Sequence, residues 1–202
     1  MRPAPRSVTE MTGSSIAEHF ASHQRVIEKC FERLLGEAEE VGGVLTNALR
    51  DGRKVIAFGN GGSATQASHL VGELLGRFKA TRQPFPAVAL SSDPGTVTCI
   101  ANDFGYDALF ERQALALAQP GDVAVGFTTS GRSENVRRGL DAARSRGAVT
   151  VAVVGGAGLV GGTADHVLAV PSDETAHVQE VHLMLLHVWC IRIDGELGEV
   201  QS

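Results

Sequence analysis

The sequence predicts an α/β protein built on a five-stranded, doubly wound parallel sheet with an N-terminal helical extension. Five short runs rich in β-branched residues are separated by segments of helical character. The runs are apolar without alternation, which is typical of parallel strands covered by helices on both faces. The expected strands are VIAF at 55–58, AVAL at 87–90, VAVGF at 123–127, VTVAVV at 149–154 and VLAV at 167–170.

Helical segments are expected at both ends of the chain. Residues 1–14 are rich in Pro, Ser and Thr and are expected to form a flexible tail, with residues 15–202 forming a single domain. That domain opens with a helical segment at 15–50, in which apolar residues recur at helical spacing and Gly42–Gly43 is a possible break. A second segment, from about Thr175 to Ile193, is apolar around most of its circumference and should be buried in the core or against another subunit.

Composition limits the function classes. The net charge of −5 and the lack of a basic tract argue against nucleic acid or an anionic membrane as the main partner. Cys30, Cys99 and Cys190 are far apart in apolar contexts, so we expect buried free thiols in a reducing compartment. No apolar run of 18 residues occurs, and the first dozen residues lack an apolar signal region. We therefore expect a cytoplasmic protein.

Two strand–loop–helix units place small, donor-rich residues at the start of a helix, where unpaired backbone N–H groups attract phosphate. The first loop is Gly59-Asn60-Gly61-Gly62-Ser63, and the second is Thr128-Thr129-Ser130-Gly131-Arg132-Ser133. Neither fits a dinucleotide or P-loop signature. Either loop alone is as well explained by a plain turn or a helix N-cap, but the pair indicates one phosphorylated ligand held from both sides.

The order of the motifs agrees with a flavodoxin-like topology. In that topology the ligand crevice lies between the first and third strands, where the strand order reverses. The two loops follow the first and third predicted strands. Their helix N-termini should therefore face a single crevice.

Four segments together resemble the bacterial sedoheptulose 7-phosphate isomerases of the sugar-isomerase (SIS) domain superfamily. The segments are GNGGSATQASHLVGELLGRF at 59–78, ANDFGYD at 101–107, TTSGRSENV at 128–136 and VQEVHLMLLH at 178–187. The similarity extends from about residue 15 to residue 195, and the motifs occur in the same order at compatible distances. This resemblance is specific, whereas the Gly-rich loop alone would be a weak signal.

The resemblance implies a homotetramer with active sites at subunit interfaces, which converts sedoheptulose 7-phosphate into D-glycero-D-manno-heptose 7-phosphate. It implies an acid–base pair, Glu73 and His187, and a zinc ion on some members. The implied zinc ligands are His69, Glu73, Gln179 and His187. The implied substrate-binding residues are Asn60, Gly61, Gly62, Ser63, Glu73, Asn102, Asp103, Thr128, Thr129, Ser130, Ser133 and Gln179.

The sequence departs from the family pattern in two places. Thr128 replaces the usual serine, which keeps the hydroxyl donor and adds a methyl group. Ala176 and His177 stand where an acidic or small residue and an arginine are common. The second change bears on which distal hydroxyls of the sugar are recognised.

Aldose–ketose isomerisation needs one group to move a carbon-bound proton and another to move a proton between oxygens. Glu73 is the candidate for the carbon proton and His187 for the oxygens, although the roles could be exchanged. His69 and Glu73, at i and i+4, share a helix face and could share a divalent ion, although such pairs are usually surface pairs. Gln179 and His187 are separated by ~12 Å of helix, so one ion is hard to place between them. Glu180 and His182 are rival candidates.

A non-catalytic SIS-domain protein is the main alternative. It would bind a phosphosugar, or resemble the tetrameric factor that binds the bacterial replication initiator. That relative lacks the helix histidine, so the presence of His187 with His69 and Glu73 favours the enzyme.

Overall fold

The computed structural model describes residues 16–198, and the predicted tail at 1–14 lies outside the described residues. These residues form one wholly parallel sheet in the order β2-β1-β3-β4-β5. The predicted doubly wound, five-stranded fold is confirmed. The strands are β1 Val55–Gly59, β2 Ala87–Ala89, β3 Val123–Thr128, β4 Val149–Val154 and β5 His166–Ala169.

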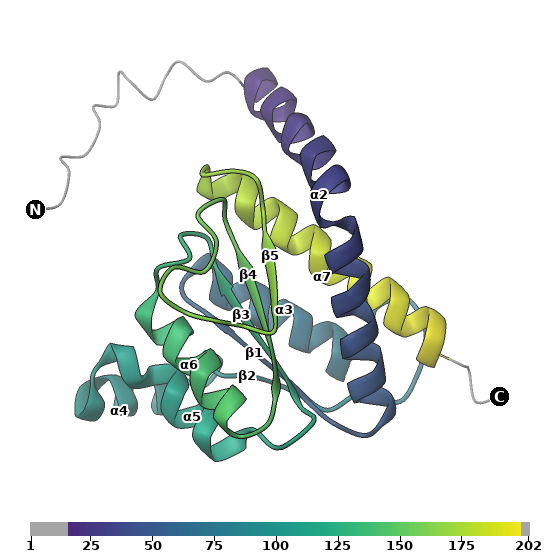
Figure 1. The fold of residues 1–202 in the computed structure, drawn as a ribbon. Coiled ribbons are helices and arrows are strands. Elements are labelled where there is room, and N and C mark those ends of the chain that lie inside the picture. The colour runs from purple at the N-terminus through teal and green to yellow at the C-terminus, as the bar shows by residue number, and fades with distance from the viewer. Residues whose placement is uncertain (1–15, 199–202) are drawn as a thin grey trace, which may run out of the picture.

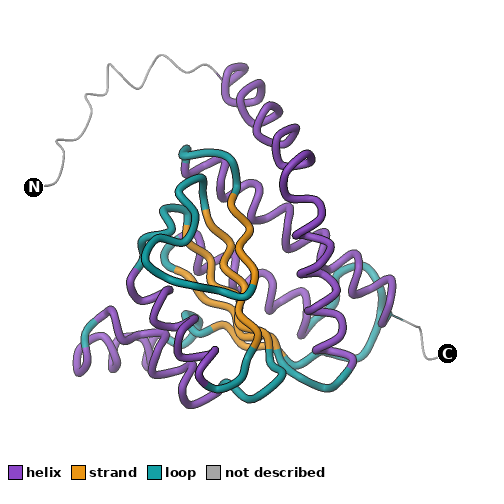
Figure 2. The backbone as a smooth tube through the Cα atoms, viewed as in Figure 1, coloured by secondary structure: helices purple, strands orange, loops and turns teal. Residues whose placement is uncertain are grey.

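Helices cover both faces of the sheet, so the strands form a central layer (Figures 1 and 2). Helices α2, α3 and α7 lie on one face, and α4, α5 and α6 lie on the other. The helices are α2 Ile16–Arg50, α3 Gly62–Leu75, α4 Pro94–Phe104, α5 Leu109–Leu117, α6 Glu134–Ser145 and α7 Thr175–Leu197, with a 3-10 turn, η1, at Tyr106–Ala108.

Each face of the sheet has its own apolar core, because successive side chains of a strand point to opposite faces. In β1, Val55 and Ala57 pack against α2, α3 and α7, whereas Ile56 and Phe58 pack against the α4–α6 layer. All four side chains are fully buried. This accounts for strands that are apolar without alternation.

Helix α2 runs unbroken through Gly42–Gly43, so the possible break predicted there does not occur. A Cβ atom on Gly42 would lie 3.1 Å from the Arg192 side chain of α7, and one on Gly43 would lie 3.2 Å from it. The indole N–H of Trp189 donates to the Ala38 carbonyl nearby. The glycine pair therefore allows α2 and α7 to pack closely. Helix α7 itself ends at Leu197, four residues beyond the predicted end at Ile193.

The connection between β4 and β5 differs from the prediction of a helix after every strand. Residues 155–165 contain no helix in the structure. Five glycines fall among the eight residues at 155–162, and this density makes a helix unfavourable. An irregular loop at 155–165 joins the two parallel strands instead.

The cysteine prediction holds in two positions of three. All three cysteines are free; Cys30 and Cys190 are buried, and burial raises the pKa of Cys30 to about 11. Cys99 is exposed, which contradicts the expected burial, because its side of α4 faces solvent beside Asp103. Among residues 16–198, no helix is long and apolar enough to cross a membrane.

Two helical glycines should respond oppositely to alanine. A Cβ atom on Gly139 of α6 would lie 2.8 Å from Phe110 and 2.9 Å from Phe58, whereas one on Gly195 of α7 would meet nothing within 4 Å. Gly139→Ala should lower the free energy of unfolding by about 1–3 kcal/mol through overpacking. Gly195→Ala should raise it by up to about 1 kcal/mol through helix propensity. Denaturant unfolding at one protein concentration measures both, and equal effects would contradict this packing.

Candidate active site

The first loop joins buried β1 to the N-terminus of α3. Gly61 occupies the N-cap position with φ +56°, a conformation that favours glycine. Glycine is required at position 62 for a different reason, because a Cβ atom there would lie 2.4 Å from the side-chain nitrogen of Gln179. Gly62 is exposed, while Ser63 is 4% exposed. The loop thus brings α7 against the first turn of α3.

The second loop joins β3 to α6 and is rich in hydroxyls. The Thr128 hydroxyl lies 3.0 Å from that of Ser133, and Ser130 Oγ accepts from the backbone N–H of Arg132. Ser133 occupies the N-cap position of α6, but its side chain makes no capping hydrogen bond. The cap explanation for this Ser therefore does not hold. Thr129 and Ser130 line a cavity of about 210 Å³ together with the segment that precedes α7.

A pair of amides ties the two loops together at the switch point between β1 and β3. Asn60 and Asn135 exchange hydrogen bonds of 2.8 and 2.9 Å through their side-chain amides. The hydroxyl of Tyr106 donates to the same Asn60 oxygen at 2.8 Å. Asn135 is 2% exposed, whereas Asn60 is only partly buried. The two loops therefore meet at the switch point between β1 and β3, as the topology predicts.

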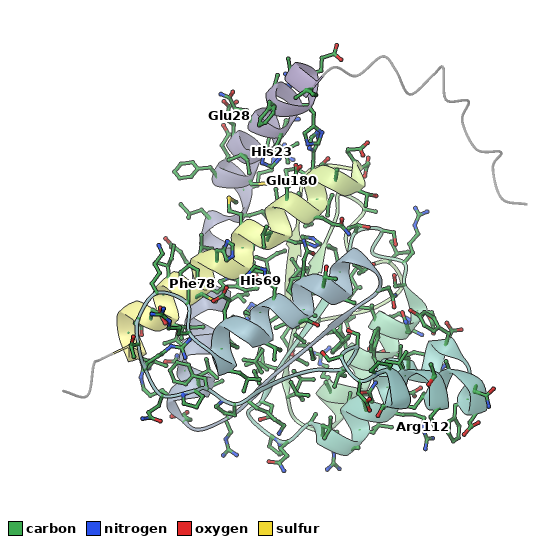
Figure 3. The ribbon with its side chains drawn as sticks, turned by 180° about the vertical axis from the view of Figure 1, so that it is seen from behind. His23, Glu28, His69, Phe78, Arg112 and Glu180 are labelled. Atoms are coloured by element: carbon green, nitrogen blue, oxygen red, sulfur yellow. The ribbon has the colours of Figure 1, made fainter. Side chains whose placement is uncertain are left out.

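Three of the predicted residues converge between α3 and α7. His69 Nε2 lies 2.9 Å from Glu73 Oε1 and 3.4 Å from His187 Nε2. The side chains of His69 and Glu73 are 40% and 20% exposed, so substrate can reach them. The ring of Phe78 stacks on His187 with centroids 5.6 Å apart, next to His69 in Figure 3. An acid, a base and a third donor atom therefore lie within contact distance.

Gln179 lies apart from these three side chains. Its side chain contacts Gly62, and its backbone carbonyl accepts from Gln66 Nε2 at 2.6 Å. Gly62 precedes His69 by seven residues, or about 10 Å along α3. The structure thus places Gln179 beside the Gly-rich loop, away from the His69–Glu73–His187 cluster.

Asn102 and Asp103 lie at the end of α4, on the other helical layer. Both are exposed, and the Asn102 amide donates to Asp103 Oδ1 at 2.8 Å. Tyr106 follows them in η1 and carries the hydrogen bond to Asn60. It is Tyr106 that contacts the Gly-rich loop, whereas the side chains of Asn102 and Asp103 hydrogen-bond within α4.

A SIS domain family model matches residues 18–155, which contain both loops, His69 and Glu73. Curated relatives extend this likeness over more of the chain. A phosphoheptose isomerase of Aquifex aeolicus is 51% identical over 161 residues, which cover 79% of this chain and 84% of the relative. The chain belongs to the phosphoheptose isomerase family of SIS-domain proteins.

Solved structures agree with this family assignment. A phosphoheptose isomerase from Francisella tularensis superposes with a TM-score of 0.83 at 32% identity, covering 89% of this chain and 96% of that one. The phosphoheptose isomerase of Neisseria gonorrhoeae gives 0.82 at 34% identity, covering 94% and 100%. These relatives favour the enzyme over the non-catalytic SIS-domain alternative.

The two rival residues of this phosphoheptose isomerase family member lie outside the crevice. His182 is fully buried beneath β4, and burial lowers its pKa to about 4, so the ring is neutral. Glu180 faces α2 and contacts His19, His23 and His177. Neither residue competes with Glu73 or His187 for the same position.

Sequence reasoning missed an ion pair that supports the cluster. Asp194 of α7 accepts from Arg82 Nε and from the backbone N–H groups of Lys79 and Ala80, each at 2.8 Å. Arg82 in turn donates to the backbone carbonyl of Glu73 at 2.9 Å. The two charged side chains are 2% and 7% exposed. The pair fixes the end of α3 against α7 at the position of Glu73.

Breaking this pair should destabilise the protein and disturb the cluster. Asp194→Ala leaves the buried Arg82 charge unpaired, which should cost about 3–5 kcal/mol in the free energy of unfolding and lower kcat. Glu196→Ala is the matched control on the same helix. Because the ion pairs of Glu196 with Arg50 and Arg192 are exposed, this change should barely alter the free energy of unfolding or kcat. Denaturant unfolding and steady-state kinetics measure the two effects.

Asp194→Ala should also change how the free energy of unfolding depends on pH. Burial alone would raise the pKa of Asp194, but the hydrogen bonds from Ala80 and Arg82 hold it below the ordinary value. Its stabilisation is therefore present above the ordinary carboxyl pKa and lost as the pH falls through the lowered one. Asp194→Ala should flatten the acid side of the stability curve, and an unchanged curve would contradict the assignment.

Proposed function

We propose that this protein is an aldose–ketose isomerase that converts sedoheptulose 7-phosphate into D-glycero-D-manno-heptose 7-phosphate without a nicotinamide or nucleotide cofactor. The observation that carries the proposal is the convergence of Glu73 and His187 beside two linked donor-rich loops. The family supports the substrate class, since its relatives are named phosphoheptose isomerases.

In the proposed mechanism, Glu73 takes a proton from the carbon next to the carbonyl and returns it to the carbonyl carbon. His187 moves a proton between the two oxygens, because its Nε2 atom points into the cluster and can exist in both protonation states. Phe78 holds the His187 ring in place by stacking. The exchange of roles between Glu73 and His187 remains the alternative assignment.

The two loops supply binding in this proposal. Thr128, Thr129, Ser130 and Ser133 donate hydrogen bonds to the phosphate, and the N-terminus of α6 contributes its positive dipole end. The sugar chain is bound by Asn60, Gly61, Gly62, Ser63, Asn102, Asp103 and Gln179. The amide pair that joins the loops supports this division, because it fixes one loop relative to the other.

We also propose that His69, Glu73 and His187 bind zinc. Their ligand atoms lie within 4.8 Å of one another, and two imidazoles with a carboxylate form a common zinc set. Zinc binding would displace the proton between His69 Nε2 and Glu73 Oε1, so that the Nε2 lone pairs of His69 and His187 and the carboxylate could all hold the ion. Gln179 would have to move to become the fourth ligand. A bound zinc ion supplies a Lewis acid for the carbonyl oxygen.

A homotetramer with interface sites and a cytoplasmic location complete the proposal. Helices α2 and α7 line an apolar groove of about 370 Å³ in which Phe31 is 71% exposed, and further apolar side chains of these helices, such as Ile191 at 50%, are exposed. A second copy would cover this surface. The free thiols support a reducing compartment. Light scattering that shows an active monomer would contradict the tetramer.

Removing either catalytic group should abolish turnover. Glu73→Gln and His187→Ala should each lower kcat on sedoheptulose 7-phosphate by about 10²–10⁴-fold, since each removes a positioned proton carrier. The reaction is followed by NMR with and without added zinc, in the absence of NAD.

The control is His166→Ala, because His166 pairs with Glu37 at the far edge of the sheet and should leave turnover unchanged. Near-normal turnover of His187→Ala would return weight to a non-catalytic role. Failure of the wild type on all C5 to C7 ketose phosphates would remove the proposal.

A further inference from the structure

Three histidines surround the carboxylate of Glu180 where the first turns of α2 meet α7. Glu180 Oε1 lies 2.8 Å from His19 Nε2, and Glu180 Oε2 lies 2.7 Å from His23 Nδ1 and 3.1 Å from His177 Nδ1. Figure 3 shows His23 and Glu180 facing each other across the two helices. The rings of His19 and His177 have centroids 4.4 Å apart. The ligand atoms of His19, His177 and Glu180 therefore all lie within 4.8 Å of one another, and His23 adjoins the same carboxylate.

The hydrogen bonds of Ser22 orient His177 as a ligand. The Ser22 hydroxyl donates its proton to the backbone carbonyl of His19, 2.9 Å away, because a carbonyl oxygen can only accept. Its oxygen is therefore free to accept from His177 Nε2–H, 2.7 Å away. In the neutral ring this leaves the Nδ1 lone pair facing Glu180 Oε2, 3.1 Å away, a contact that either a second ring proton or a bound cation makes attractive. Metal-binding histidines commonly have their second nitrogen fixed in this way.

His23 lies beside the same carboxylate but is oriented differently. Its Nδ1 atom is buried and lacks a hydrogen-bond partner among the described residues, although Glu180 Oε2 is only 2.7 Å away. This contact lacks the geometry of a hydrogen bond, so the Nδ1 lone pair is not directed at that oxygen, and the ring would have to turn for His23 to become the fourth ligand. Ligand atoms on one tetrahedral zinc ion, with bonds of ~2.0–2.1 Å, lie roughly 3.3 Å apart. For His19, His177 and Glu180, whose ligand atoms lie within 4.8 Å of one another, small side-chain rotations reach that value.

We propose that His19, His23, His177 and Glu180 form a binding site for a divalent transition-metal ion of the zinc class. Three imidazoles and one carboxylate suit zinc, cobalt and nickel rather than calcium or magnesium. The ion would clamp the N-terminal part of α2, which extends past the sheet in Figure 1, onto α7.

This site is separate from the active-site cluster. His177 precedes His187 by ten residues, or about 15 Å along α7. None of its four ligands belongs to the His69–Glu73–His187 group. The two sites can therefore be tested independently, and the new site does not depend on the proposed activity.

The test is a Co²⁺ titration of untagged full-length protein carrying His69→Ala and His187→Ala, which removes the active-site ligands. We expect one Co²⁺ per chain by calorimetry, visible absorption of a four-coordinate ion, and a higher Tm. Adding His19→Ala and His23→Ala should abolish all three signals. Adding His166→Ala instead, which removes the histidine from a third group of possible ligands with Glu37 and Glu40, should leave them unchanged.

Ser22→Ala gives a second measurement that spares all four ligands. It should weaken Co²⁺ binding by about 10–100-fold, because it removes the hydrogen bond that orients His177, together with the local bond to the His19 carbonyl. Circular dichroism of each metal-free variant verifies that α2 is intact. Absence of Co²⁺ binding in the double variant, or binding unaffected by loss of His19 and His23, would overturn the proposal.

Discussion

Helix α7 runs parallel to α3 on one face of the sheet, and the proposed catalytic side chains belong to these two helices. Three contacts along the pair define this alignment: Gln179 with Gly62, His187 with His69, and Asp194 with Arg82 just beyond α3. Because both helices rise by the same amount per residue, each contact sets the register of the next. A slip of one turn would separate His187 from Glu73 by about 5 Å.

Strand order and packing against α2 together fix the positions of α3 and α7. The neighbouring positions of β1 and β3 place the two donor-rich loops side by side, and the Asn60–Asn135 amides join them. Trp189 anchors α7 to α2 through the Ala38 carbonyl, so α7 is held from two directions. The site thus combines loops fixed by strand order with side chains fixed by helix packing.

The sequence alone predicted the sheet, both loops and the convergence of His69 with Glu73, because these depend on local patterns and on one topological rule. It could not predict contacts between distant segments. Asn135, Tyr106 and Arg82 act through partners 46 to 112 residues away, and no spacing within a motif indicates such partners. The ~12 Å of helix between Gln179 and His187 predicted that a single ion is hard to place between them. The two side chains do lie at different points along α3.

Other differences have equally specific causes. Gly42 and Gly43 suggested a helix break, but tertiary packing against Arg192 outweighs the local preference of glycine. Cys99 lies in an apolar stretch of sequence, yet the side of α4 that carries it faces solvent. The loop at 155–165 lacks a helix because its glycines favour turns.

The central claim is that Glu73 and His187 act as one unit because α3 and α7 hold them together. A double-mutant cycle on kcat/KM with Glu73→Gln, His187→Ala and the combined variant tests it most directly. The account predicts that the double variant is barely slower than either single variant, because either change already disables the unit. Losses that multiply in the double variant would show two independent contributions and contradict it.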